Sequence, residues 1–282
     1  MKTRLFAILL GAMTAGTVSI HAQSVASPEQ APAATPPAST APTPPSWAWT
    51  IEPTYVSTYM FRGQRLGGQS FEPSLAATYG NWAFGVWAND PVNNKNKVPG
   101  QSDPEIDPQG SYTFNVNNSL SIQPGFTWYT YCRAPLNQGF YRMTFEPNIA
   151  VNYTFQDLTL TPKFYYDMVL HTATYEMNGT YAVPLKSLGT EFDLAVAAGT
   201  YYGSDVVNTA GVPNTPRTAA WGDYWSAGAS MPFKLGNSVK LVAGWTYTEG
   251  TDAYLQVRNR PRTLNTEAVG RGVASASVVF SF

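Results

Sequence analysis

The sequence predicts an all-β protein, a single closed antiparallel β-barrel of about twelve strands that crosses a membrane. Three observations support this fold class. Apolar and polar residues alternate over long stretches, the connections between these stretches alternate between short and long, and the last stretch ends in an aromatic residue. A soluble β-sandwich accounts for the alternation, but it gives no reason for the sorting of connection lengths.

The clearest alternation lies in residues 141–171, which we interpret as two strands joined by a tight turn. In residues 141–155 the odd positions are apolar or aromatic and most even positions are polar. After Gln156 and Asp157 the pattern restarts with the opposite parity. Successive strand side chains point to opposite faces, so each strand has one apolar and one polar face. A membrane-spanning strand needs about 9 to 11 residues, and both stretches are long enough.

Composition narrows the class of protein further. The chain is 44% hydrophobic and only 12% charged, with 17 Tyr, 14 Phe and 8 Trp. No apolar run of about 18 residues follows the N-terminal region, which excludes a bundle of transmembrane helices and leaves a closed barrel as the membrane fold. A net charge of -1 without a basic patch argues against a nucleic-acid partner. Cys132 is the single cysteine, so no intrachain disulfide is expected.

The N-terminal region divides into two parts before the barrel. Residues 1–22 begin with Lys2 and Arg4, continue through an apolar run and end in Ala22, the order expected of a cleaved signal peptide. An uncleaved anchor is the less favoured alternative, because the apolar run is short and interrupted by Gly and Thr. Residues 23–46 are rich in Pro, Ala and Thr and are predicted to form a disordered periplasmic linker. The barrel is expected to occupy residues 47–282.

The predicted strands are sorted by their connections. Strands are expected near residues 49–62, 70–79, 82–90, 103–116, 119–133, 141–155, 158–171, 174–184, 191–203, 219–232, 238–249 and 269–282. Connections after even-numbered strands are short, at 80–81, 117–118, 156–157, 185–190 and 234–237, whereas most after odd-numbered strands are long, notably 91–102, 205–218 and 250–268. In outer-membrane barrels the short turns face the periplasm.

Two further features concern assembly and strand geometry. The last strand ends at Phe282, similar to the terminal signal by which barrel-insertion machinery recognises outer-membrane proteins, so we expect that machinery as a partner. Prolines such as Pro53, Pro73 and Pro147 lie inside strands. Because proline removes a hydrogen-bond donor and a closed barrel has no edge, several β-bulges are expected.

The charged strand residues are predicted to face the lumen, since the apolar parity must face lipid. The expected pore-lining or constriction residues are Arg62, Glu72, Glu105, Asp107, Arg142, Glu146, Lys163, Asp167, Glu176 and Arg271. Barrels of 8 strands are filled by side chains and those of 16 to 18 leave a channel, so an intermediate barrel predicts a narrow, partly occluded pore. The alternative is a set of internal ion pairs that only supports the wall.

The turn at Gln156 predicts a register for the central hairpin. Pairing Phe155 with Leu158 sets Glu146 opposite Asp167, and it sets Arg142 opposite His171. Like charges directly opposite each other are destabilising. We therefore expect Arg142 and Lys163, on the same face, to reach in between the two carboxylates. The hypothesis is that Glu146, Asp167, Arg142 and Lys163 form the charged ring at the narrowest point.

Catalytic and metal sites find little support in the sequence. After removal of the predicted signal peptide His171 is the one remaining histidine, and no serine follows it at the spacing of an outer-membrane lipid hydrolase. Asp103, Glu105 and Asp107 share one strand face and offer oxygen ligands to Ca²⁺, although pore-lining charge is the favoured interpretation. No cofactor is expected.

Three short segments resemble a known family. Tyr59-Met-Phe-Arg-Gly63, Trp82-Ala-Phe-Gly-Val-Trp-Ala-Asn89 and Glu105-Ile-Asp107 are similar to motifs of the TorF family of porin-like proteins. The resemblance implies an outer-membrane barrel. Together with the residue pattern, it leads us to expect passive diffusion of small polar solutes or ions through a narrow charged lumen surrounded by outer-membrane lipids. The alternatives are a closed structural barrel whose long loops bind partners and, less favoured, a lipid hydrolase.

Overall fold

The computed structural model describes residues 46–92, 104–132, 142–169, 171–204, 219–250 and 270–282. The predicted signal peptide, almost all of the predicted linker and most of the predicted long connections lie outside these residues. Within the described part of the chain, no helix has the length and apolar character needed to cross a membrane.

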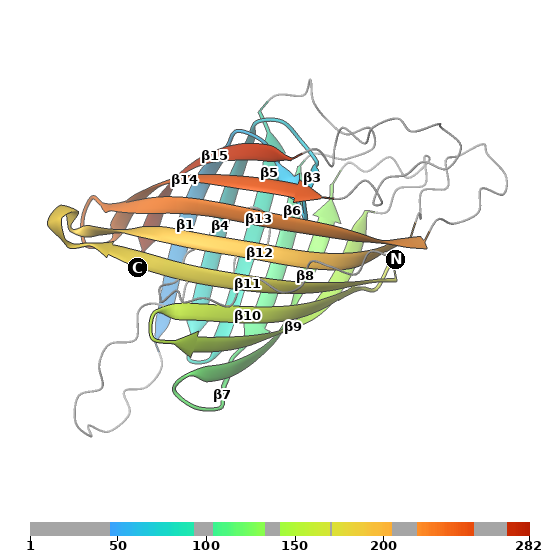
Figure 1. Cartoon of the computed structure of the whole chain (residues 1–282), viewed down its shortest axis with the longest axis horizontal. Coiled ribbons are helices and arrows are strands. Elements are labelled where there is room, and N and C mark those ends of the chain that lie inside the picture. Colours follow the sequence, from blue (N-terminus) through green and yellow to red (C-terminus); the bar gives the residue numbers. More distant parts are fainter. Residues whose placement is uncertain (1–45, 93–103, 133–141, 170, 205–218, 251–269) are drawn as a thin grey trace, which may run out of the picture.

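The strands form one closed antiparallel barrel (Figure 1). Neighbours in the wall follow the order β6-β5-β4-β1-β15-β14-β13-β12-β11-β10-β9-β8, and β6 pairs with β8 to close it. The wall strands are β1 (Trp47–Val56), β4 (Ser70–Tyr79), β5 (Trp82–Pro91), β6 (Glu105–Tyr112), β7 (Phe114–Asn115), β8 (Leu120–Tyr131), β9 (Met143–Phe155), β10 (Leu158–Asp167), β11 (Thr172–Leu185), β12 (Thr190–Ser204), β13 (Ala219–Lys234), β14 (Val239–Gly250) and β15 (Arg271–Ser281). Because β7 continues β6 along β8, the barrel has twelve strands, which confirms the predicted fold class.

Strand register is constant along each described pair, and the bulges expected at the prolines are not found there. Pro53 lies opposite Pro73 in the β1–β4 pair, and the register is the same on both sides of them. Proline removes a single backbone donor from the ladder. A twisted strand pair tolerates that loss without inserting an extra residue, so the sequence expectation was wrong.

The outer surface of the barrel is apolar and is bordered by aromatic side chains at both ends. At the end that carries the short turns, called the inner end here, the exposed aromatics include Trp47, Trp49, Tyr79 and Trp82. The rings of Trp47 and Tyr79 lie 5.1 Å apart. At the opposite, outer end the exposed aromatics include Phe71, Trp128, Phe145, Tyr175 and Trp221. An apolar band between two aromatic girdles is typical of a surface that faces lipid.

The predicted first strand, residues 49–62, was wrong at its outer end. β1 stops at Val56, and a separate pair, β2 (Met60–Phe61) and β3 (Gln64–Arg65), lies between β1 and β4. Arg62 and Gly63 form its turn with φ of 46° and 77°, and hairpin turns of the I′ type require positive φ at both central positions. We call residues 57–69 the inner hairpin because they fold inside the barrel; they follow the outer end of β1 and do not belong to the inner end.

Candidate pore constriction

The base of the inner hairpin is fixed to the wall by backbone hydrogen bonds. The Ser57 N–H donates to the Ala274 carbonyl of β15 at 2.9 Å, and the Val92 N–H, directly after β5, donates to the Gln69 carbonyl at 2.8 Å. At the tip, a Cβ added to Gly63 would lie 2.6 Å from the Glu249 carbonyl oxygen of β14. Only glycine allows this approach, so the tip packs directly on backbone at the outer end of β14.

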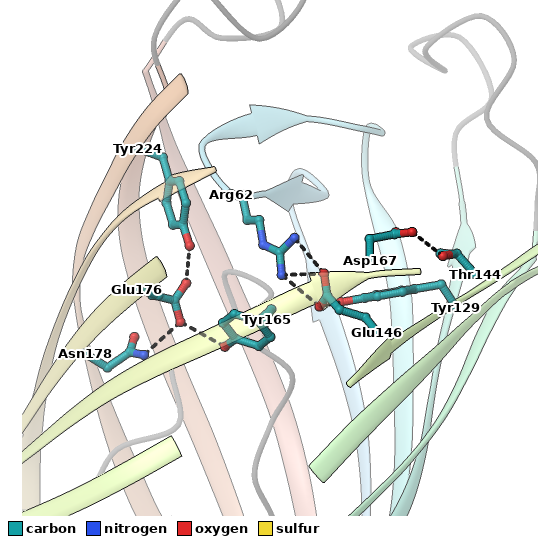
Figure 2. Close-up of polar contacts among 9 residues, drawn as sticks. All are labelled: Arg62, Tyr129, Thr144, Glu146, Tyr165, Asp167, Glu176, Asn178 and Tyr224. Atoms are coloured by element: carbon teal, nitrogen blue, oxygen red, sulfur yellow. Dashed lines mark hydrogen bonds and ion pairs between the residues drawn. The ribbon is translucent and has the colours of Figure 1, made fainter. Parts of the chain in front are cut away.

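Arg62 extends from the hairpin turn to the far side of the lumen. Its guanidinium donates to Glu146 of β9, with Nη1 3.0 Å from Oε2 and Nη2 2.9 Å from Oε1. Four wall strands separate β1 from β9 on the shorter way around the barrel. Figure 2 shows the guanidinium pointing from the hairpin to this carboxylate. The two side chains are 9% and 2% exposed, so the pair bridges the lumen in a region with little water.

Aromatic rings surround the guanidinium and orient it. Its central carbon lies 4.7 Å from the ring centre of Phe61 and 4.9 Å from that of Tyr165 on β10. Such cation–π contacts contribute about 0.5 to 2 kcal/mol each, more when water is excluded. The Tyr129 hydroxyl of β8 donates to Glu146 Oε1 at 3.0 Å, so the carboxylate accepts from a cation and a phenol together.

Glu176 of β11 is held by neutral donors instead. The Tyr165 hydroxyl donates to its Oε1 at 3.1 Å and the Asn178 amide donates to the same oxygen at 2.8 Å. The Tyr224 hydroxyl of β13 donates to Oε2. Figure 2 shows these groups converging on the carboxylate. Lys163 lies directly opposite Glu176 in the β10–β11 register.

The predicted register of the central hairpin is confirmed, but the predicted position of Arg142 between the two carboxylates is wrong. Phe155 pairs with Leu158, and the Met168 N–H donates to the Phe145 carbonyl at 3.0 Å, which keeps Glu146 level with Asp167. Asp167, however, accepts from the Thr144 hydroxyl.

Arg142 is exposed at the outer end instead of reaching in, and the cation at Glu146 is Arg62. The alternation of residues within the central hairpin gives no information about Arg62, which is 84 positions away and reaches Glu146 from across the lumen.

The neighbouring wall, β4 to β6, carries a second group of acids. The Tyr59 hydroxyl of the inner hairpin donates to Glu105 Oε2 at 2.6 Å. The Thr130 backbone N–H donates to Asp107 Oδ1 at 3.2 Å. Glu72, on β4, is 3% exposed. Tyr59 therefore joins the inner hairpin to this wall, as Arg62 joins it to the other.

The predicted site residues occupy four kinds of position. The six acids are buried inside the barrel, namely Glu72, Glu105, Asp107, Glu146, Asp167 and Glu176. Arg62 is at the hairpin turn, Lys163 and Arg271 are partly buried on β10 and β15, and Arg142 is exposed. Their role in lining a pore stays a prediction.

Four tyrosines that hold the acids were missed by the sequence analysis: Tyr59, Tyr129, Tyr165 and Tyr224. Each is at most 6% exposed. For the last three, their position on the inward parity of their strands was a usable signal, because a buried Tyr hydroxyl seeks a partner.

The residues weighed for catalysis and metal binding are not assembled into such sites. His171 is exposed in the β10–β11 connection with φ of 53°. In the part of the chain that the structure describes, no three His, Cys, Asp or Glu side chains are grouped to hold a metal ion. Asp103, one of the three predicted Ca²⁺ ligands, lies outside the described residues.

A small cavity with both polar and apolar lining residues lies on the wall formed by β5, β6, β8, β9 and β10. Its polar lining residues include Gln109, Ser111, Gln123, Asn148 and Lys163. The Gln123 amide donates to the Ser111 hydroxyl at 3.1 Å. Apart from Lys163, the side chains that line this cavity are uncharged, and several of them can form hydrogen bonds.

Comparison with known proteins gives similarity at the level of fold. No family model matches the chain, and no curated protein matches it. The resemblance to the TorF family therefore stays a prediction.

Several solved outer-membrane proteins align over most of their length. The NanC porin aligns at 11% identity and a TM-score of 0.47, over 82% of this chain and 98% of that one. The KdgM porin, solved in complex with disordered oligogalacturonate, aligns at 11% identity and a TM-score of 0.48, over 83% and 99%. An outer-membrane channel from Pseudomonas putida F1 aligns at 11% identity and a TM-score of 0.39, over 89% and 100%. Similarity this low says nothing about the solute.

Proposed function

We propose that the protein is a channel of the bacterial outer membrane through which small polar solutes or ions diffuse passively. The observation that carries this proposal is the inner hairpin, which reaches across a barrel interior lined by buried polar and charged side chains and is joined to β9 by the Arg62–Glu146 bridge. The apolar band and its girdles supply the lipid-facing surface. In this proposal the strand that ends at Phe282 is the segment read by the barrel-insertion machinery.

The charges of the lumen favour the passage of cations. The outer half of the barrel lumen contains six buried carboxylates and three cationic side chains, those of Arg62, Lys163 and Arg271. The charge of Arg62 is paired with that of Glu146. Rings of acidic side chains select cations in narrow pores. A small cation, or a small neutral solute with hydroxyl groups, therefore matches the passage better than an anion does.

Conductance measurements on the refolded barrel test this proposal. In planar bilayers, wild-type protein that migrates as folded barrel on unheated gels should give discrete conductance steps and, under a KCl gradient, a reversal potential of cationic sign. Glu146→Gln combined with Asp167→Asn removes two lumen carboxylates and should move the reversal potential toward anions. Exposed Arg142→Ala is the matched control and should leave it unchanged.

Two outcomes would contradict the proposal. Absence of conductance steps from correctly folded protein would favour the closed structural barrel. An unchanged reversal potential in the folded double variant would show that Glu146 and Asp167 do not control the passage of ions.

A further inference from the structure

Four inward-facing residues form a row across strands β1, β4, β5 and β6. Thr54 lies opposite Glu72 in the β1–β4 register, and Asn89 lies opposite Glu105 in the β5–β6 register. Between β4 and β5, Phe71 pairs with Asp90 and Ser74 with Trp87, which sets Glu72 level with Asn89. The row is therefore continuous, in the order Thr54, Glu72, Asn89 and Glu105.

Each member of this row is almost fully buried, and the row lacks positive charge. Thr54, Glu72, Asn89 and Glu105 are between 1% and 3% exposed. Within the described ranges, no cationic side chain forms an ion pair with Glu72 or Glu105. The Asn89 Oδ1 and Thr54 Oγ1 atoms are buried without a hydrogen-bond partner there. The two acids, on β4 and β6, thus flank an unpartnered amide carbonyl oxygen on β5.

This arrangement is costly unless a cation completes it. Two carboxylates that share one buried site repel each other unless a positive charge lies between them. A buried acceptor without a partner has lost its hydrogen bonds to water without replacing them. All of the oxygens are hard ligands, and carboxylates together with an amide carbonyl are the ligand types that Ca²⁺ takes.

We propose that Glu72, Asn89 and Glu105 form a binding site for a hard cation of the Ca²⁺ type, with the Thr54 hydroxyl at its edge. The donor set contains two carboxylates and two neutral oxygens, so it differs from a three-acid cluster. The Tyr59 hydroxyl donates to Glu105 Oε2 and places the inner hairpin beside the site. The bound ion joins β4, β5 and β6 at the level of the hairpin. The site exists whether or not the barrel conducts.

Terbium luminescence on the refolded full barrel in detergent tests this site. Tb³⁺ replaces Ca²⁺ at oxygen sites. Trp87 shares the inward face of β5 with Asn89, and its ring is 5.9 Å from that of Tyr59, so both rings can sensitise the emission. The wild type should give saturable emission that Ca²⁺ displaces. Glu72→Gln and Asn89→Leu should each weaken binding by at least the roughly tenfold that even outer-shell changes cause at metal sites.

Control variants separate this site from general surface binding. Glu52→Gln removes another partly buried acid from β1 outside the row, and it should leave the Tb³⁺ affinity unchanged. Asn89→Asp adds a third carboxylate and should raise the affinity, which gives a test of opposite sign if Asn89→Leu fails to fold. Absence of saturable emission in the wild type, or equal affinities in the wild type, Glu72→Gln and Asn89→Asp, would overturn the proposal.

Discussion

Two neighbouring parts of the wall that contact the inner hairpin, β8–β10 and β4–β6, compensate their acids in different ways. On the β8–β10 wall, Glu146 has both carboxylate oxygens bound by Arg62 and one also by Tyr129. On the β4–β6 wall, Glu72 and Glu105 have no cationic side chain within ion-pair distance in the described ranges. The hairpin offers this second wall only a phenol, that of Tyr59.

This difference indicates two uses of the same chemical group. A carboxylate with an internal cation is a fixed strut, because removing either partner leaves a buried charge alone. A carboxylate without one is available to a mobile cation. The inner hairpin is therefore bound tightly to the β8–β10 wall by charge, and the acids of the neighbouring β4–β6 wall are left available to an ion.

The largest effect is expected when Arg62 is removed. Arg62→Ala leaves Glu146 buried without its cation and should lower the free energy of unfolding by about 3 kcal/mol, the lower bound for breaking a buried ion pair. Arg142→Ala, at an exposed position, should change it by no more than about 0.5 kcal/mol. Urea unfolding in lipid vesicles, followed by tryptophan fluorescence, measures both. Equal effects of the two variants would show that the bridge does not hold the hairpin.

Removing one acid from each wall should change the free energy of unfolding in opposite directions, and both changes should be smaller than that of Arg62→Ala. Glu146→Gln removes a charge-assisted partner of Arg62 and should destabilise by about 1.5 to 3 kcal/mol. In a chelator, Glu72→Gln should be neutral or stabilising, since it removes one of two neighbouring uncompensated acids. The same unfolding assay, run in EDTA, compares them. If Glu72→Gln destabilises as much as Glu146→Gln under these conditions, then an internal group compensates Glu72 and the walls do not differ.

The sequence predicted the wall of the barrel well, for a physical reason. Side-chain alternation and connection length are local properties, so they determined the twelve strands, the inward parity and the pairing of Phe155 with Leu158. The inner hairpin was missed because residues typical of strands, Tyr59 to Phe61 among them, continue after Val56, where the chain leaves the wall. The glycines at 63, 67 and 68 were the available signal for a turn.

Of the candidate site, the sequence correctly predicted only the acidic residues. Lipid excludes charge from the outer face, and this explains why Glu72, Glu105 and Glu146 were correctly placed inside the barrel. The choice of cation was wrong because it depends on how the hairpin folds across the lumen. Likewise, the row through Asn89 becomes visible only when three strand registers are known together.

Single-channel conductance of Arg62→Ala, beside wild type and Arg142→Ala, tests most directly the claim that the inner hairpin is the narrowest part of a conducting barrel. Without the bridge the hairpin loses its hold on β9, and Glu146 faces the lumen as a free carboxylate. Arg62→Ala should therefore give larger conductance steps and a stronger preference for cations, and Arg142→Ala should behave as wild type. Identical step size and reversal potential in all three folded proteins would contradict it.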